Sequence, residues 1–102
     1  MILQGGAILN LGLLTLRNSK VEHNTGTATG RAGVALGGGV WNGTFPDSPK
    51  LQLTLVGSQV TGNALSASPG VTVRGGGLYT ERPVTLTTSV ISGNSPDQCY
   101  GC

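Results

Sequence analysis

An eleven-residue phrase occurs three times in the chain and restricts what it can fold into. The copies align without a gap and read LTLRNSKVEHN at 14–24, LTLVGSQVTGN at 53–63 and VTLTTSVISGN at 84–94. A second phrase precedes each copy and reads GGAILN at 5–10, GGGVWN at 37–42 and GGGLYT at 75–80. Two phrases that recur in a fixed order, 32 and then 38 residues apart, indicate a repeat architecture.

The periodicity inside the phrase is two, which is the period of a β-strand. Leu53 and Leu55 fall on one face and Thr54 on the other, and Val60 returns to the inner face. The Asn-Ser or Gly-Ser pair in the middle lets the chain bend between two short strands. Helical periodicity is absent, so the chain is predicted to be all-β.

Short strands repeated in register predict a right-handed parallel β-helix, a solenoid of about three rungs. The rungs are expected at approximately 5–36, 37–74 and 75–102, within a single domain that spans 1–102. Right-handedness follows from the general rule for parallel crossovers. Rungs stack at roughly 4.8 Å, so equivalent residues form columns. The predicted interior columns are Leu14, Leu53 and Val84; Leu16, Leu55 and Leu86; Val21, Val60 and Ile91; and Ile8, Val40 and Leu78.

The corners differ in length and composition. Residues 43–52 form an inserted loop in which Pro46 and Pro49 exclude a strand. The small-residue segments 25–36 and 64–74 are also predicted to be loops, with a short strand near 71–73. The Asn that ends each phrase is predicted to form a hydrogen-bonded ladder and to supply the left-handed backbone that a tight corner needs. The ladder residues are Asn24, Asn63 and Asn94.

Composition and charge indicate the class of protein. Charged residues are only 10% of the 102 residues, so Thr, Ser, Asn and Gly must cover the surface, as in many extracellular β-proteins. The net charge is +2 and the basic residues are spread along the chain, which argues against a nucleic-acid partner. The apolar start, 1–16, lacks the features of a signal peptide. Because no polar cap precedes the first phrase, we expect a fragment of a longer solenoid that associates end to end.

The GGAI segment at 5–8 and the S-x-V-x-G-N pattern at 58–63 resemble the repeats of chlamydial polymorphic outer-membrane proteins. They also resemble those of other bacterial surface proteins with right-handed parallel β-helices. The resemblance covers nearly the whole chain, although the first copy has Glu22 and His23 where the others have Thr or Ser and then Gly. It implies export, a cell-surface or secreted location, a membrane-anchored parent protein and, in some members, adhesion. It carries no catalytic motif.

Four carboxylates test the alternative of a pectate-lyase-like enzyme, because such enzymes need acids that converge on one face. They are Glu22, Asp47, Glu81 and Asp97, and no two share a column of the repeat. They are therefore interpreted as surface charges, and no metal or other cofactor is predicted. His23 is interpreted as a corner residue. Ser19, Ser58 and Ser89 recur in every copy, which suits a structural hydroxyl better than a nucleophile.

Cys99 and Cys102 form a C-x-x-C pair with three interpretations. A zinc site needs two further ligands, and only His23 is at hand. A thioredoxin-like motif should open a helix in a βαβ setting. A local disulfide suits an exported protein and is favoured, with free thiols next.

Two further features bear on function. Thr15, Thr54 and Thr85 form a column of the kind seen on ice-binding solenoids, but a second Thr column is missing. Trp41, Phe45 and Tyr79 are the candidate binding surface. If Trp41 and Tyr79 point outward, they form an aromatic platform for sugar rings or for a host-surface partner, and if they point inward they belong to the core. The favoured function is a non-enzymatic extracellular or cell-surface module that presents loops for adhesion or binding. The alternatives are a fragment of a carbohydrate-active, pectate-lyase-like β-helix enzyme whose catalytic rungs lie outside this stretch and, third, an ice-binding protein.

Overall fold

The computed structural model describes residues 2–30, 32–43 and 51–102, and its regular structure in these ranges is entirely β-strand. The strands are β1 (Ile2–Gln4), β2 (Ile8–Asn10), β3 (Leu13–Arg17), β4 (Lys20–Glu22), β5 (Thr25–Ala28), β6 (Gly33–Leu36), β7 (Val40–Asn42), β8 (Gln52–Val56), β9 (Gln59–Thr61), β10 (Ala64–Ala67), β11 (Val71–Arg74), β12 (Leu78–Thr80), β13 (Val84–Thr87), β14 (Val90–Ser92) and β15 (Cys99–Tyr100). They form five sheets, ordered β1-β6-β11, β10-β5, β15-β12-β7-β2, β13-β8-β3 and β14-β9-β4. Every pair is parallel, which confirms the predicted all-β, parallel class.

The pairing register joins equivalent positions of the repeated phrases. Leu14 pairs with Leu53, which is the partner of Val84, and Leu16, Leu55 and Leu86 pair in the same way. The other two predicted columns also lie in register, through β4-β9-β14 and β2-β7-β12. Like residues therefore stack on like, as the phrase predicts.

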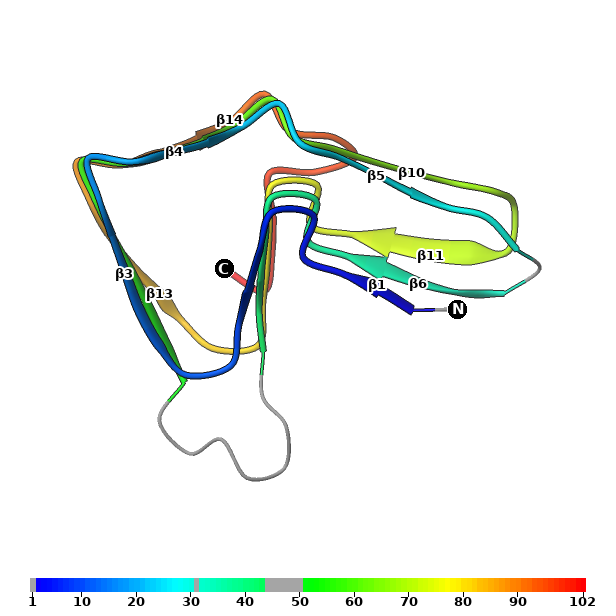
Figure 1. The fold of residues 1–102 in the computed structure, drawn as a ribbon, viewed down its shortest axis with the longest axis horizontal. Coiled ribbons are helices and arrows are strands. Elements are labelled where there is room, and N and C mark those ends of the chain that lie inside the picture. The colour runs from blue at the N-terminus through cyan, green and yellow to red at the C-terminus, as the bar shows by residue number, and fades with distance from the viewer. Residues whose placement is uncertain (1, 31, 44–50) are drawn as a thin grey trace.

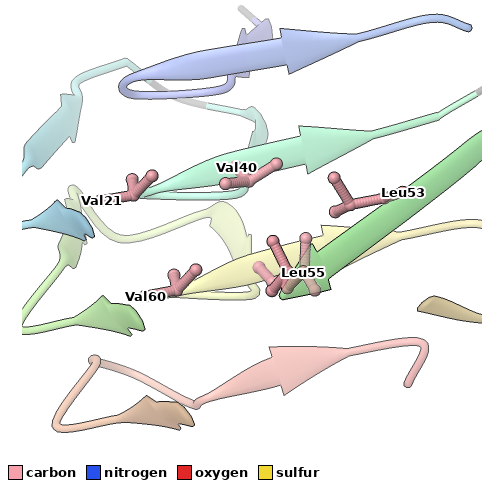
Figure 2. Close-up of a cluster of buried hydrophobic side chains, with 6 residues drawn as sticks. Val21, Val40, Leu53, Leu55 and Val60 are labelled. Carbon is pink, nitrogen blue, oxygen red and sulfur yellow. The ribbon is translucent and has the colours of Figure 1, made fainter. Parts of the chain in front are cut away.

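Two parts of different width make up the cross-section (Figure 1). Strands β3 and β13 form one side of a wide part and β4 and β14 a second side, while β5 and β10 lie opposite β1, β6 and β11 in a narrow arm. The wide part holds the larger core cluster, Val21, Val40, Leu53, Leu55, Val60 and Leu78, whose side chains converge from different sheets (Figure 2). The arm holds a smaller one of Ala28, Ala35 and Leu65.

The narrow arm corrects the prediction that 25–36 and 64–74 are loops. Both segments contain paired strands, and only β11 was anticipated. The arm is thin, so large inward side chains such as Leu65 are combined with small ones such as Ala28 and Ala35. A Cβ added to Gly26 would lie 2.8 Å from a methyl carbon of Leu65. Small residues in such segments mark close packing rather than irregular chain.

Left-handed backbone occurs at two corners of each phrase. Asn18, Gly57 and Thr88 adopt φ of 48°, 56° and 45° at the first corner. His23, Gly62 and Gly93 adopt φ of 58°, 65° and 65° at the second. The left-handed residue is thus the one before the ladder Asn, not the Asn as predicted.

The predicted loop 43–52 is only partly described. Gly43 and Leu51 are buried, and Gln52 already belongs to β8, where it pairs with Leu13. The loop therefore ends before Gln52, earlier than predicted, because β8 begins one residue before the repeated phrase. Residues 44–50, Phe45 and Asp47 among them, lie outside the described residues.

Candidate functional site

A ladder of Asn side chains runs through the molecule. The Nδ2 atom of Asn24 donates to Oδ1 of Asn63 at 2.9 Å, and Nδ2 of Asn63 donates to Oδ1 of Asn94 at 2.9 Å. Each acceptor oxygen also receives the backbone N–H of the preceding Asn, at 3.0 and 2.8 Å. Asn63 donates in addition to the carbonyl of Val21. The hydrogen-bonding capacity of these side chains is used to join the copies, which is a structural role.

Two further polar columns do the same work. The Nδ2 atom of Asn10 donates to Oδ1 of Asn42 at 2.8 Å, and Nδ2 of Asn42 donates to Oγ1 of Thr80 at 2.9 Å. This ladder was missed in the sequence because Thr80 breaks the run of identical residues, although its hydroxyl accepts the same bond.

The serine column is the second of these. The Oγ atom of Ser58 accepts the N–H of Ser19 at 3.1 Å, and Oγ of Ser89 accepts the N–H of Ser58 at 3.0 Å. Ser58 is buried and its hydroxyl lies within hydrogen-bond distance of the Leu16 and Val56 carbonyls. All three hydroxyls contact the backbone, which fits structural serines.

An aromatic column occupies the outer face of the sheet β15-β12-β7-β2. The inner positions of these strands, such as Val40 and Leu78, point into the core, so the alternating positions point outward. The outward residues in register are Leu9, Trp41, Tyr79 and Tyr100. The rings of Trp41 and Tyr79 are stacked with centroids 6.3 Å apart, and those of Tyr79 and Tyr100 with centroids 5.5 Å apart.

Exposure differs among the members of this column, from 50% at Leu9 through a buried Trp41 to the more exposed Tyr79 and Tyr100. Trp41 is only 3% exposed, and its indole N–H has no hydrogen-bond partner in the described part of the chain. Tyr79 is half-buried and Tyr100 is 41% exposed. Trp41 is therefore the buried member of the stack, and the accessible rings are those of Tyr79 and Tyr100. Tyr100 was missed in the sequence because it lies beyond the third phrase.

A cation completes this surface. The guanidinium of Arg74, an exposed residue at the end of β11, lies over the Tyr100 ring, 4.8 Å from its centroid. Burial raises the pKa of the Tyr79 hydroxyl, the charges of Glu81 and Tyr100 raise it further, and Arg74 acts in the opposite direction. Tyr79 is therefore a neutral phenol near neutral pH, able to donate and accept hydrogen bonds. We call Arg74, Tyr79 and Tyr100 the aromatic–arginine surface.

Of the candidate carboxylates, Glu81 lies close enough to this surface for its charge to raise the pKa of Tyr79. The other described candidates lie apart from the surface or bond to the backbone. Glu22 and His23 are exposed at the end of β4 and the corner after it. Asp97 accepts the N–H groups of Gly75 and Gly76. Within the described ranges, no three His, Cys, Asp or Glu side chains are grouped as metal ligands, and the surface shows no pocket.

Cys99 and Cys102 are joined by a disulfide, with Cα atoms 5.9 Å apart. Cys99 pairs with Leu78 and packs against the larger core cluster, so the bridge ties the chain end to the sheet.

Comparisons with protein-family models, with curated proteins and with solved structures give no match to this chain. Among the described residues, no helix is long and apolar enough to cross a membrane.

Proposed function

We propose that the chain is a stretch of right-handed parallel β-helix that serves as a non-enzymatic module of a surface or secreted protein. The observation that supports this most is the Asn ladder, in which the repeated polar residue of each copy is used to hold the next copy. The shortest extent of the molecule, 17 Å, fits three to four strands stacked at roughly 4.8 Å. Equivalent strands follow one another in the same order in the first two copies, and the third copy keeps this order without the two arm strands. Right-handed crossovers are the rule for parallel strands.

The module's binding surface is the aromatic–arginine surface, and its ligand class is an extended acidic polysaccharide. Tyrosine rings and hydroxyls suit the apolar faces and hydroxyls of sugars. The guanidinium of Arg74 suits a carboxylate or sulfate, since its donors match the geometry of such groups. The two accessible rings, Tyr79 and Tyr100, lie with centroids 5.5 Å apart along the repeat axis, so two consecutive sugar units can contact them.

Affinity electrophoresis in gels that contain polygalacturonate, with neutral dextran as the comparison polymer, tests this proposal. The native chain should be retarded by polygalacturonate, and Tyr100→Ala and Arg74→Gln should each lose most of the retardation. Arg17→Gln is the matched control, because Arg17 is an exposed arginine on β3 that has the same charge but contacts no ring among the described residues. Equal retardation of Arg74→Gln and Arg17→Gln would show that general charge, not this surface, is responsible.

The same polymer separates binding from turnover. A binding module leaves polygalacturonate intact, whereas a chain that itself cleaves pectin releases unsaturated or reducing ends. Release of such ends by the purified chain would eliminate the non-enzymatic proposal.

A further inference from the structure

The chain takes a shortcut after the third phrase. In the second copy, the path from Asn63 to β12 passes through both strands of the narrow arm, β10 and β11. In the third, the path from Asn94 to β15 consists only of residues 95–98. These four residues replace an entire arm, yet they return the chain to the register of the sheet, where Cys99 pairs with Leu78.

The short segment 95–98 lies beside two backbone N–H groups of the third glycine phrase. In the earlier copies, the equivalent N–H groups donate to carbonyls of the next copy. In the first copy, the N–H groups of Gly5 and Gly6 donate to the carbonyls of Leu36 and Gly37 at 3.0 and 2.9 Å. The glycine phrase of the second copy repeats this with carbonyls of the third. Each glycine turn thus depends on two carbonyls from the copy stacked on it.

In the third copy a carboxylate takes the place of those carbonyls. The Oδ1 atom of Asp97 accepts the N–H of Gly75 at 2.8 Å and the N–H of Gly76 at 3.0 Å. Both glycines are buried, so their donors could not turn to water without exposing the corner.

The Asn ladder is completed in the same way. Asn94 Oδ1 accepts both the N–H and the Nδ2 of Asn63. Gln98 Oε1 accepts both the N–H and the Nδ2 of Asn94, at 2.9 and 3.1 Å. The amide of Gln98, on a longer side chain, therefore occupies the place that the next ladder Asn would occupy.

We infer that residues 95–99 are a cap in which two side chains imitate a further copy of the repeat. Asp97 supplies the acceptor for the glycine turn, Gln98 supplies the acceptor for the Asn ladder, and Cys99 continues the core column beside Leu78. The cap satisfies donors that would otherwise be buried without partners, and this applies to the stack at this corner whatever the chain binds.

Amide hydrogen exchange of the full chain, followed residue by residue by NMR, tests the cap. Asp97→Leu should raise exchange at Gly75 and Gly76 roughly tenfold or more, because each amide loses a bond to a charged acceptor. Gln98→Leu should do the same at Asn94. The amides of Gly37 and Gly38, which donate to backbone carbonyls, should change little.

Two sets of variants make the result decisive. Asp97→Asn keeps an acceptor oxygen and should retain most of the protection that Asp97→Leu removes. Glu22→Leu and Gln59→Leu are matched controls, since both residues are exposed on strands, and they should leave the three amides unchanged. Exchange at Gly75 and Gly76 that is unchanged in Asp97→Leu, or raised equally in Asp97→Asn, would overturn the assignment.

Discussion

The left-handed corners show how single residues adapt to a position that the stack imposes. Asn18, Gly57 and Thr88 occupy the same corner in the three copies, all with positive φ. Glycine adopts this conformation without steric penalty and Asn tolerates it, but a β-branched Thr is strained there. Strain of this kind arises because the copies must superimpose while their sequences differ.

Replacing Thr88 by Gly should therefore stabilise the protein. Relief of the left-handed strain contributes about 1–2 kcal/mol. Part of it is offset by the greater flexibility of glycine in the unfolded chain, so a net gain of up to about 1 kcal/mol is expected. Urea unfolding measures it. Thr87→Gly is the control, because Thr87 lies in β13 without positive φ, and it should destabilise. Destabilisation by both variants would refute the strain argument.

Asn63 is the residue on which the ladder depends most. It is fully buried and bonded to Asn24, Asn94 and the Val21 carbonyl, whereas Asn24 is half-buried and donates in one direction. Asn63→Ala should cost about 3 kcal/mol or more, since each buried group left without a partner costs about 1–3 kcal/mol. Asn24→Ala should cost about 1 kcal/mol. Denaturant midpoints compare the two, and equal losses would show that burial within the ladder does not matter.

At the scale of single residues, a ladder could be predicted from the sequence only where the same residue recurs in every copy. The Asn24–Asn63–Asn94 ladder was visible because one residue recurs at one position. The Asn10–Asn42–Thr80 ladder was hidden by a change of residue that preserves the hydrogen bond. The role of Gln98 in the ladder was harder still to predict, because Gln98 lies outside the repeated phrase and has a longer side chain than Asn.

Among the elements, burial depends on a strand's place in the stack as well as on its sequence. Leu16, Leu55 and Leu86 share one column, yet Leu55 is 0% and Leu86 47% exposed. Strand β8 lies between two partners, while β13 is the edge of its sheet. The sequence predicted the column correctly but not this difference, because periodicity assigns a face and not the number of neighbouring strands. It also misread the narrow arm, whose small residues resemble those of loops.

The same truncation should accordingly have unequal effects in the two strands. Leu55→Ala removes a fully buried side chain and should cost about 2–5 kcal/mol, the usual range for core Leu. Leu86→Ala should cost less than half as much, because about half of its side chain is already in contact with water. Thermal unfolding of the two variants gives the comparison. Similar losses would indicate that further contacts cover Leu86 in solution.

At the scale of the whole molecule, the third copy is covered at one corner, while two of its strands have no partner on their outer side among the described residues. The cap formed by residues 95–99 covers the glycine turn and the Asn ladder, but β13 and β14 remain edge strands of their sheets. Val90 and Leu86 on these strands are among the exposed large hydrophobic residues. Unpaired edges of this kind attract other strands unless something covers them. End-to-end self-association, predicted from the sequence on the assumption of uncapped ends, should thus be limited by how much of the end the cap protects.

Weakening the cap should increase association between chains. The double variant Asp97→Leu/Gln98→Leu frees the donors of Gly75, Gly76 and Asn94 and places two apolar side chains in the segment that follows β14. Light scattering after size-exclusion chromatography, over a range of protein concentrations, should show a larger mean mass than for the native chain. The double variant Glu22→Leu/Gln59→Leu adds the same apolar groups on the strands β4 and β9, away from the cap, and should associate less. If the two double variants associate equally, added hydrophobicity alone is the cause and the cap does not limit assembly.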